Sequence, residues 1–244
     1  MLFVGNPVTS NRKLAAEAIG TMLLLSAIVG SGIMGERLSG GNVAIALLAN
    51  TLATGAMLVV IILVFGPISG AHFNPVVTLA LASQGEMRWR DTPAYVVVQV
   101  LGALVGVAAA HIMFSEPLFS PSQHARAGGA QLFSEFMATF GLLVVVWGGG
   151  RARPQAAPFA VGAYITAGYW FTASTAFANP AVTVARSLTN TFSGIRPTDV
   201  PGFIGAQFVG ATAATILFRW LIRTPQSNLR ARDDSYKEMV SRGK

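Results

Sequence analysis

The 244-residue chain contains no cysteine, three histidines and few charged residues, since Asp, Glu, Lys and Arg together make up 11% of it. The lack of cysteine excludes disulfides, thiol nucleophiles and thiolate metal ligands. His72, His111 and His124 are scattered without the spacing of a metal site. No Ser, His and carboxylate converge at one depth of the chain, which disfavours an enzyme. The sequence therefore predicts no metal, no cofactor and no catalytic residue.

Apolar residues are abundant instead, because hydrophobic residues make up 52% of the chain and its mean hydropathy is +0.56. A single water-soluble core cannot hide so much apolar surface, so we expect a lipid bilayer to cover it. A helix needs about 20 apolar residues to cross roughly 30 Å of hydrocarbon. Six stretches qualify, and they are residues 14–34, 43–65, 93–114, 131–147, 158–175 and 201–220.

The placement of Lys and Arg predicts the orientation of these spans. Six spans put both ends of the chain on one face, and loops rich in Lys and Arg stay on the cytoplasmic side. Most of the 17 basic residues fall on the face that carries the termini. The opposite face keeps only Arg37, Arg126, Arg186 and Arg196. We therefore expect a multi-pass protein of the plasma (inner) membrane with both termini cytoplasmic, and the net charge of +7 needs no nucleic-acid partner.

One motif occurs twice. Asn74-Pro75-Val76 lies in the context Phe-Asn-Pro-Val-Val-Thr-Leu-Ala, and Asn179-Pro180-Ala181 lies in Ala-Asn-Pro-Ala-Val-Thr-Val-Ala. An early Glu in the first span, Glu17, is matched by Glu135 in the fourth. The duplication predicts an inverted repeat. The resulting division is an N-terminal cytoplasmic segment 1–12, a first repeat 13–115, a connecting extracellular loop 116–130, a second repeat 131–222 and a cytoplasmic tail 223–244.

Each motif follows a run of small residues, 66–72 in the first copy and 173–177 in the second, which predicts a loop that enters the membrane. Proline favours the first helical position, and the apolar runs 76–82 and 181–185 are too short to span. We therefore expect two half-helices that start near the bilayer centre with Asn as N-cap. Non-helical backbone at that depth is tolerated only where protein buries it or water lines it, so we expect a cavity there. The helix N-termini would repel cations there, and the Asn amides would offer donors to a neutral solute.

With these motifs the chain resembles the aquaporin, or major intrinsic protein, family over about residues 13–222. The resemblance implies an all-α membrane protein with six transmembrane helices and two re-entrant half-helices. It also implies one pore per subunit, a homotetramer in the lipid bilayer and a passive channel for small neutral solutes. In the family, acids at the positions of Glu17 and Glu135 brace the re-entrant loops.

The sequence departs from the family where the pore is narrowest. Most members carry Arg directly after the second motif, and this chain carries Val182. Counting from the motifs assigns the other filter positions to Thr54, Ala167 and Ala176. Such a ring is wide and weakly polar, which implies passage of water and of larger neutral solutes such as glycerol or arsenous acid. The Val76 variant and the stretch 164–186 are similar to those of bacterial channels associated with metalloid handling.

Two alternatives stay open. Arg186 lies one helical turn beyond Val182, so it either reaches back over the constriction from the outer vestibule or pairs with a loop acid or outer water. A secondary transporter built on an inverted repeat is the alternative to a channel. A transporter needs coupling carboxylates at mid-membrane, but the only acids within the spans are Glu17 and Glu135. The channel is therefore favoured.

Overall fold

The computed structural model describes residues 8–222, and this part of the chain is helical with no strand. Residues 1–7 of the N-terminal segment and the expected tail, 223–244, lie outside the described residues.

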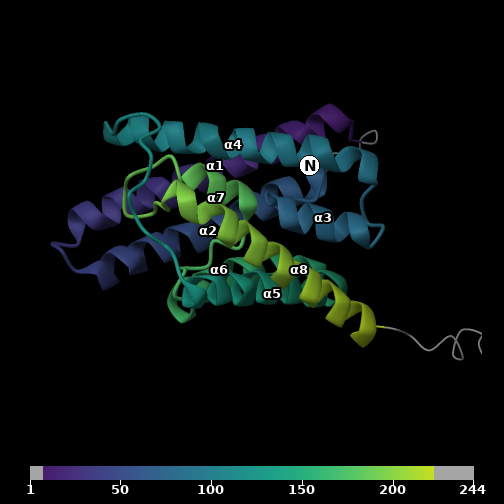
Figure 1. Cartoon of the computed structure of the whole chain (residues 1–244). Coiled ribbons are helices and arrows are strands. Elements are labelled where there is room, and N and C mark those ends of the chain that lie inside the picture. The colour runs from purple at the N-terminus through teal and green to yellow at the C-terminus, as the bar shows by residue number, and fades with distance from the viewer. Residues whose placement is uncertain (1–7, 223–244) are drawn as a thin grey trace, which may run out of the picture.

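Each repeat contributes three long helices and one short one (Figure 1). The first repeat contains α1 (Ser10–Leu38), α2 (Val43–Ser69), α3 (Pro75–Ser83) and α4 (Thr92–Phe114). The second contains α5 (Gly129–Ala152), α6 (Ala157–Phe171), α7 (Pro180–Arg186) and α8 (Val200–Leu221). Single 3-10 turns η1 (Trp89–Asp91), η2 (Pro154–Ala156) and η3 (Pro197–Asp199) precede α4, α6 and α8.

Five helices of the described chain, α1, α2, α4 with η1, α5 and α8, are long and apolar enough to cross a membrane. The sixth expected span, 158–175, is shorter than expected because α6 ends at Phe171. At 1.5 Å per residue its 15 residues measure roughly 22 Å. The Thr172 hydroxyl donates to the carbonyl of Gly168 (2.6 Å) and accepts from the backbone N–H of Ala176 (2.9 Å). These bonds turn the chain out of α6 and into the second re-entrant loop.

The end of α2 also differs from the expectation. The segment 66–72 was expected to be a loop, but α2 continues to Ser69 with Pro67 in its last turn. Gly70 ends the helix in the left-handed region at φ 93°, a conformation that glycine adopts without the strain of a Cβ. The first re-entrant loop is therefore limited to residues 70–74.

Glycines bring helices into backbone contact at matched places in the two repeats. A Cβ added to Gly102 of α4 would lie 2.3 Å from the carbonyl oxygen of Ala18 in α1. A Cβ added to Gly210 of α8 would lie 2.4 Å from the carbonyl oxygen of Phe136 in α5. Close approach of this kind drives helix association in membranes. The pairs α1–α4 and α5–α8 are therefore equivalent crossings of the inverted repeat.

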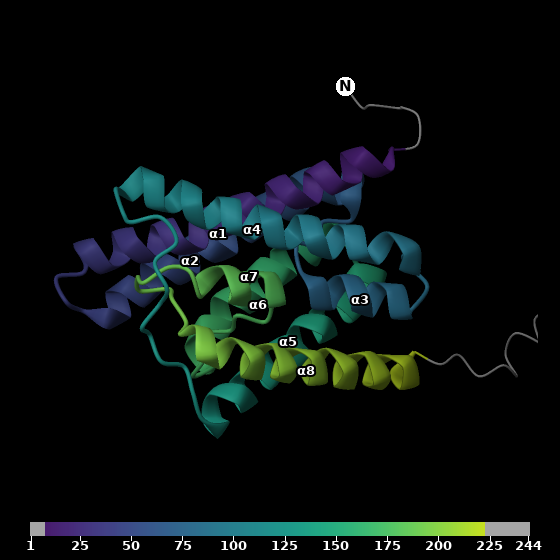
Figure 2. The same ribbon diagram turned by 45° about the horizontal axis from the view of Figure 1, so that its top comes forward.

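The repeats meet through α2 and α6, and both half-helices lie between the two groups of long helices (Figures 1 and 2). α3 and α7 contact one another, and each also packs against both α4 and α8. The chain enters α3 and α7 from loops that dip into the middle of the bundle. This arrangement places the two Asn-Pro motifs side by side at its centre.

Candidate functional site

Both motif asparagines cap the half-helices that follow them. The side-chain oxygen of Asn74 accepts from the backbone N–H of Val76 (3.0 Å). That of Asn179 accepts from the N–H groups of Ala181 (2.9 Å) and Val182 (3.3 Å). Proline follows each Asn at the first helical position, where its missing N–H costs nothing. The local sequence thus determines where each half-helix begins.

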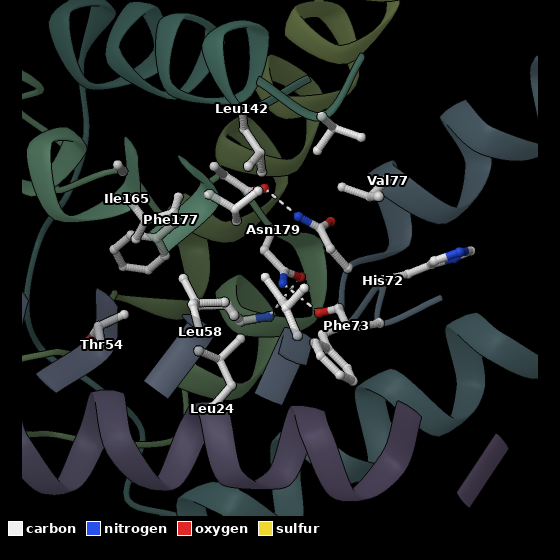
Figure 3. Close-up of a pocket in the computed structure, with 18 of the residues that line it drawn as sticks. Leu24, Thr54, Leu58, His72, Phe73, Val77, Leu142, Ile165, Phe177 and Asn179 are labelled. Atoms are coloured by element: carbon white, nitrogen blue, oxygen red, sulfur yellow. Dashed lines mark hydrogen bonds between the residues drawn. The ribbon is translucent and has the colours of Figure 1, made fainter. Parts of the chain in front are cut away.

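The same two side chains join the repeats. The Asn74 amide nitrogen donates to the carbonyl of Ala178 (2.7 Å), and the Asn179 amide nitrogen donates to the carbonyl of Phe73 (2.8 Å) (Figure 3). A primary amide carries two N–H donors, so each Asn keeps one that these bonds do not use. From the sequence we expected the Asn amides to donate to an oxygen of the permeating solute. The sequence did not indicate that each amide also donates to a carbonyl of the opposite repeat. Each motif therefore fixes the position of the other.

The residues before each Asn adopt a strained backbone conformation. Phe73 has φ 48° and Ala178 has φ 47°, both in the left-handed region that non-glycine residues avoid. Such a conformation costs about 1–3 kcal/mol per residue and persists only where surrounding contacts hold it. Here the contact is a buried carboxylate. Oε2 of Glu17 accepts from the N–H of Phe73 (2.7 Å), and Oε2 of Glu135 accepts from the N–H of Ala178 (2.9 Å).

Each of these glutamates belongs to a polar network that occurs in both repeats. A carboxylate within a membrane span is costly unless such partners bind it. Gln99 of α4 donates to Glu17 (2.8 Å), and Gln207 of α8 donates to Glu135 (2.6 Å). The same two amide nitrogens lie 2.9 Å from threonine hydroxyls of α3 and α7, Thr78 and Thr183 respectively. Both glutamates are fully buried and lie outside the lining of the central cavity. Their geometry is that of supports for the re-entrant loops.

A cavity of about 290 Å³ lies beside the two half-helices and is also lined by α1, α2, α5, α6 and both re-entrant loops. His72 lies toward one end of it and Thr54 toward the other, with Asn179 between them (Figure 3). Aliphatic side chains such as Leu58 and Ile165 line much of its wall, and the polar groups come mainly from the re-entrant loops. The cavity therefore has a largely apolar wall with hydrogen-bonding groups along part of it.

Three of the four expected filter residues line this cavity, and the fourth does not. Thr54, Ala176 and Val182 are buried and lie along it. Ala167 is exposed on the outer surface of α6, so its assignment to the filter is wrong. Tyr169 lines the cavity instead, and its hydroxyl lies 3.2 Å from that of Thr54. Two residues rotate a side chain by about 200° around a helix, which is why Ala167 faces away when Tyr169 faces in.

Arg186 lies at the wall of the cavity and is 1% exposed. Its Nε donates to the carbonyl of Ser193 in the loop after α7. Its guanidinium carbon lies 3.5 Å from the ring centroid of Phe177, which also lines the cavity. A cation over an aromatic face is attracted by the ring electrons. The Arg186 side chain thus packs over Phe177 of the re-entrant loop.

A second arginine lies nearby that the sequence pattern placed only on the outer face. Arg126, in the loop between α4 and α5, is 7% exposed. Its Nε donates to the carbonyl of Gly194 (2.8 Å) and its Nη1 to the carbonyl of Ser174 (3.1 Å). Burial lowers the pKa of Arg126 to about 10, so its guanidinium stays charged at neutral pH. The one feature of the sequence that could have pointed to Arg126 is that it is an arginine in a loop with few charged residues.

Long apolar helices around a cavity, with two half-helices that meet near the centre of the bundle, define a membrane channel. A family model described as "Major intrinsic protein" matches residues 6–173. The chain belongs to this family, the aquaporins, which confirms the resemblance noted in the sequence.

Two relatives and one solved structure agree with this assignment. The chain is 53% identical to "Aquaglyceroporin AqpS" of Rhizobium meliloti (strain 1021), over 90% of this chain and 94% of that protein. It is 32% identical to "Aquaporin NIP1-1" of Zea mays, over 95% of this chain and 82% of that protein. The X-ray structure of the aquaglyceroporin from Plasmodium falciparum superposes with a TM-score of 0.62 at 22% identity, covering 86% of this chain and 94% of that one. The structural match shows the shared fold, which is all-α and aquaporin-like.

Proposed function

We propose that this protein is a passive channel for small uncharged solutes, and that it conducts water together with larger neutral molecules such as glycerol or arsenous acid. The observation that carries the proposal is the central cavity, which is lined by both motif asparagines and by Val182 at the position where most relatives carry arginine. The name of the relative from Rhizobium meliloti, an aquaglyceroporin, supports the same solute class.

The chemistry of the path favours neutral solutes over ions. A solute that enters a narrow apolar tube loses most of its water, and an ion pays far more for that loss than a hydroxyl group does. The second N–H of Asn74 and of Asn179 can replace one lost water bond of a neutral solute. The N-terminal ends of α3 and α7 meet beside these amides and add partial positive charge, which disfavours cations.

The size of the permeant follows from the ring around the outer part of the cavity. We assign this ring to Thr54, Tyr169, Ala176 and Val182, with Arg186 beside it in the outer vestibule. Alanine and valine leave more room than the arginine of most relatives, while the hydroxyls of Thr54 and Tyr169 supply hydrogen bonds along one wall. A ring with small side chains on one side and hydroxyls on the other is suited to molecules that carry several hydroxyl groups.

Orientation and assembly complete the proposal. The expected placement of most Lys and Arg residues on one face supports cytoplasmic termini in the plasma (inner) membrane. The exposed apolar side chains on the outer faces of α2, α4 and α8, among them Leu52, Val105 and Val209, suit lipid and the neighbouring subunits of a homotetramer. Each subunit contains its own cavity, so transport does not require a shared central pore.

Replacing Val182 with arginine tests the filter. Arginine is larger than valine and always charged, so Val182→Arg should lower glycerol permeability at least about tenfold, equivalent to roughly 1.4 kcal/mol of added barrier. Water permeability should fall much less. Stopped-flow light scattering on proteoliposomes, with water and glycerol measured on one preparation of folded protein, gives both values.

Val182→Leu is the matched control, because leucine adds volume without charge or donors. It should lower glycerol permeability less than arginine does. If Val182→Arg reduces water and glycerol by the same factor, or speeds glycerol, Val182 does not line the narrowest point. The assignment of a wide filter would then be wrong.

A further inference from the structure

Two buried arginines converge on one aromatic ring at the outer end of the cavity. The guanidinium carbon of Arg186 lies 3.5 Å from the ring centroid of Phe177, and that of Arg126 lies 5.0 Å from it. Phe177 lines the cavity two residues before Asn179. Arg186 belongs to the half-helix that follows the second motif, whereas Arg126 comes from the loop between the repeats. The two side chains therefore connect this loop to the pore wall.

The donors of Arg126 bridge the two ends of the second re-entrant segment. Nη1 donates to the carbonyl of Ser174, which lies in the re-entrant loop just before Ala176 and Phe177. Nε donates to Gly194, which follows α7 and lies next to Ser193, the acceptor of Arg186. One planar guanidinium thus joins the segment before the second motif to the segment after it. Lysine cannot reproduce this pattern, because its donors lie on a single nitrogen.

The loop that carries Arg126 is held against the same region along its length. The N–H of Ser122 donates to the carbonyl of Ser187 (2.9 Å), and the N–H of Arg196 donates to the carbonyl of His124 (2.7 Å). The N–H of Arg126 itself donates to the carboxylate of Asp199 (2.8 Å). Figures 1 and 2 show this connection crossing one end of the bundle from α4 to α5. These hydrogen bonds hold the loop in place and so fix the position of the Arg126 backbone.

We propose that Arg126 is a positioning residue that sets the width of the outer constriction. The Val182 side chain contributes no hydrogen-bond donor to this part of the wall, and Arg126, from outside the second repeat, holds the adjoining backbone. By binding Ser174 and Gly194 together, Arg126 fixes the loop that carries Ala176 and Phe177 and the segment next to Ser193, which anchors Arg186. The proposal deepens the proposed function, because it names a residue that controls which solutes the same pore admits.

The test compares Arg126→Lys with Arg37→Lys in proteoliposomes. Arg37 is a matched control, because it also lies in the outer part of the molecule. Its guanidinium donates to the carbonyl of Phe114 (2.9 Å) and lies 5.4 Å from the centroid of the Phe114 ring. Its partners, Phe114 and Glu116, do not belong to the second re-entrant segment. The probes are glycerol and xylitol, which differ by two hydroxymethylene groups. The Arg126→Lys protein should raise the xylitol-to-glycerol permeability ratio at least about threefold, because a loosened wall discriminates less by size. Arg37→Lys should leave the ratio unchanged.

A ratio separates pore width from folding, since a variant that merely folds poorly lowers both permeabilities together. Hydrogen exchange gives a second measurement on the same proteins. The backbone amides of residues 172–178 should exchange at least about tenfold faster in Arg126→Lys than in the wild type or in Arg37→Lys. Arg126→Gln, which keeps a planar donor without charge, replaces the lysine variant if that one does not fold.

An unchanged ratio together with unchanged exchange in folded Arg126→Lys overturns the proposal, as does a ratio that falls. Failure of the proposed function gives a different result: wild-type liposomes would then pass glycerol no faster than protein-free vesicles. In that case the exchange measurement alone decides whether Arg126 holds the re-entrant segment.

Discussion

Single side chains determine the polarity of the cavity wall near Val182. The hydroxyls of Thr54 and Tyr169 lie 3.2 Å apart, so α2 and α6 together present one hydrogen-bonded pair to the cavity. The crossing of these helices makes this contact possible, because a Cβ on Gly55 would lie 3.0 Å from the carbonyl oxygen of Gly162. The pair can exchange its internal bond for bonds to a passing polyol at little cost, since one hydrogen bond replaces another.

Tyr169→Phe tests whether this pair serves the permeant. The change removes one hydroxyl and keeps the ring, and a lost hydrogen bond is worth about 0.5–1.5 kcal/mol. Glycerol permeability should therefore fall by roughly 2- to 10-fold relative to that of water. Ala167→Leu is the control at the position first counted from the motif, and it should leave both permeabilities unchanged because Ala167 faces outward. A glycerol loss in Ala167→Leu with none in Tyr169→Phe would restore the original assignment.

At the scale of the elements, the half-helices depend on bonds that a soluble helix rarely needs. Each begins deep in the structure with a capping Asn, and the amide of that Asn also binds the opposite repeat. The strained residues Phe73 and Ala178 provide the carbonyls that receive these bonds, and Glu17 and Glu135 hold their N–H groups. The cap, the reciprocal bond and the carboxylate support therefore act on different backbone groups of the same two short segments, 73–76 and 178–182.

Asn74→Ala should lower stability more than an ordinary cap deletion does. Loss of the cap costs about 0.5–2 kcal/mol, and loss of the bond to Ala178 adds about 0.5–1.5 kcal/mol. Asn42→Ala is the matched variant, because Asn42 caps α2 at an exposed site through the N–H groups of Ala44 and Ile45. Thermal unfolding in detergent and glycerol flux in liposomes measure the two effects. We expect reduced flux only for Asn74→Ala, and equal behaviour of the two variants would make the motif a simple cap.

At the scale of the whole molecule, the sequence was most informative where its signal was local or repeated. The runs 76–82 and 181–185 predicted half-helices that the structure shows as α3 and α7, because Pro and Asn specify a helix start within a few residues. Tyr169, the α6 residue that lines the cavity next to Thr54, was missed because counting back from Asn179 crosses the turn at Thr172, and a short error in register reverses the face of a helix. Arg126 was missed because its acceptor Ser174 lies 48 residues away, a separation that no local pattern encodes.

The duplicated architecture also predicts how transport responds to gradients. Both buried glutamates of the spans are occupied by matched hydrogen bonds and lie outside the cavity lining, so neither is placed to carry a coupling proton. Glycerol flux should therefore rise linearly with its concentration gradient, run equally well in either direction and ignore an imposed pH difference. Mercurials should have no effect, because the chain has no cysteine to modify. Glycerol uptake into proteoliposomes with and without a pH gradient measures the flux and its dependence on protons, with protein-free vesicles as the baseline. Saturation at millimolar glycerol combined with a dependence on the proton gradient would favour the transporter alternative over the channel.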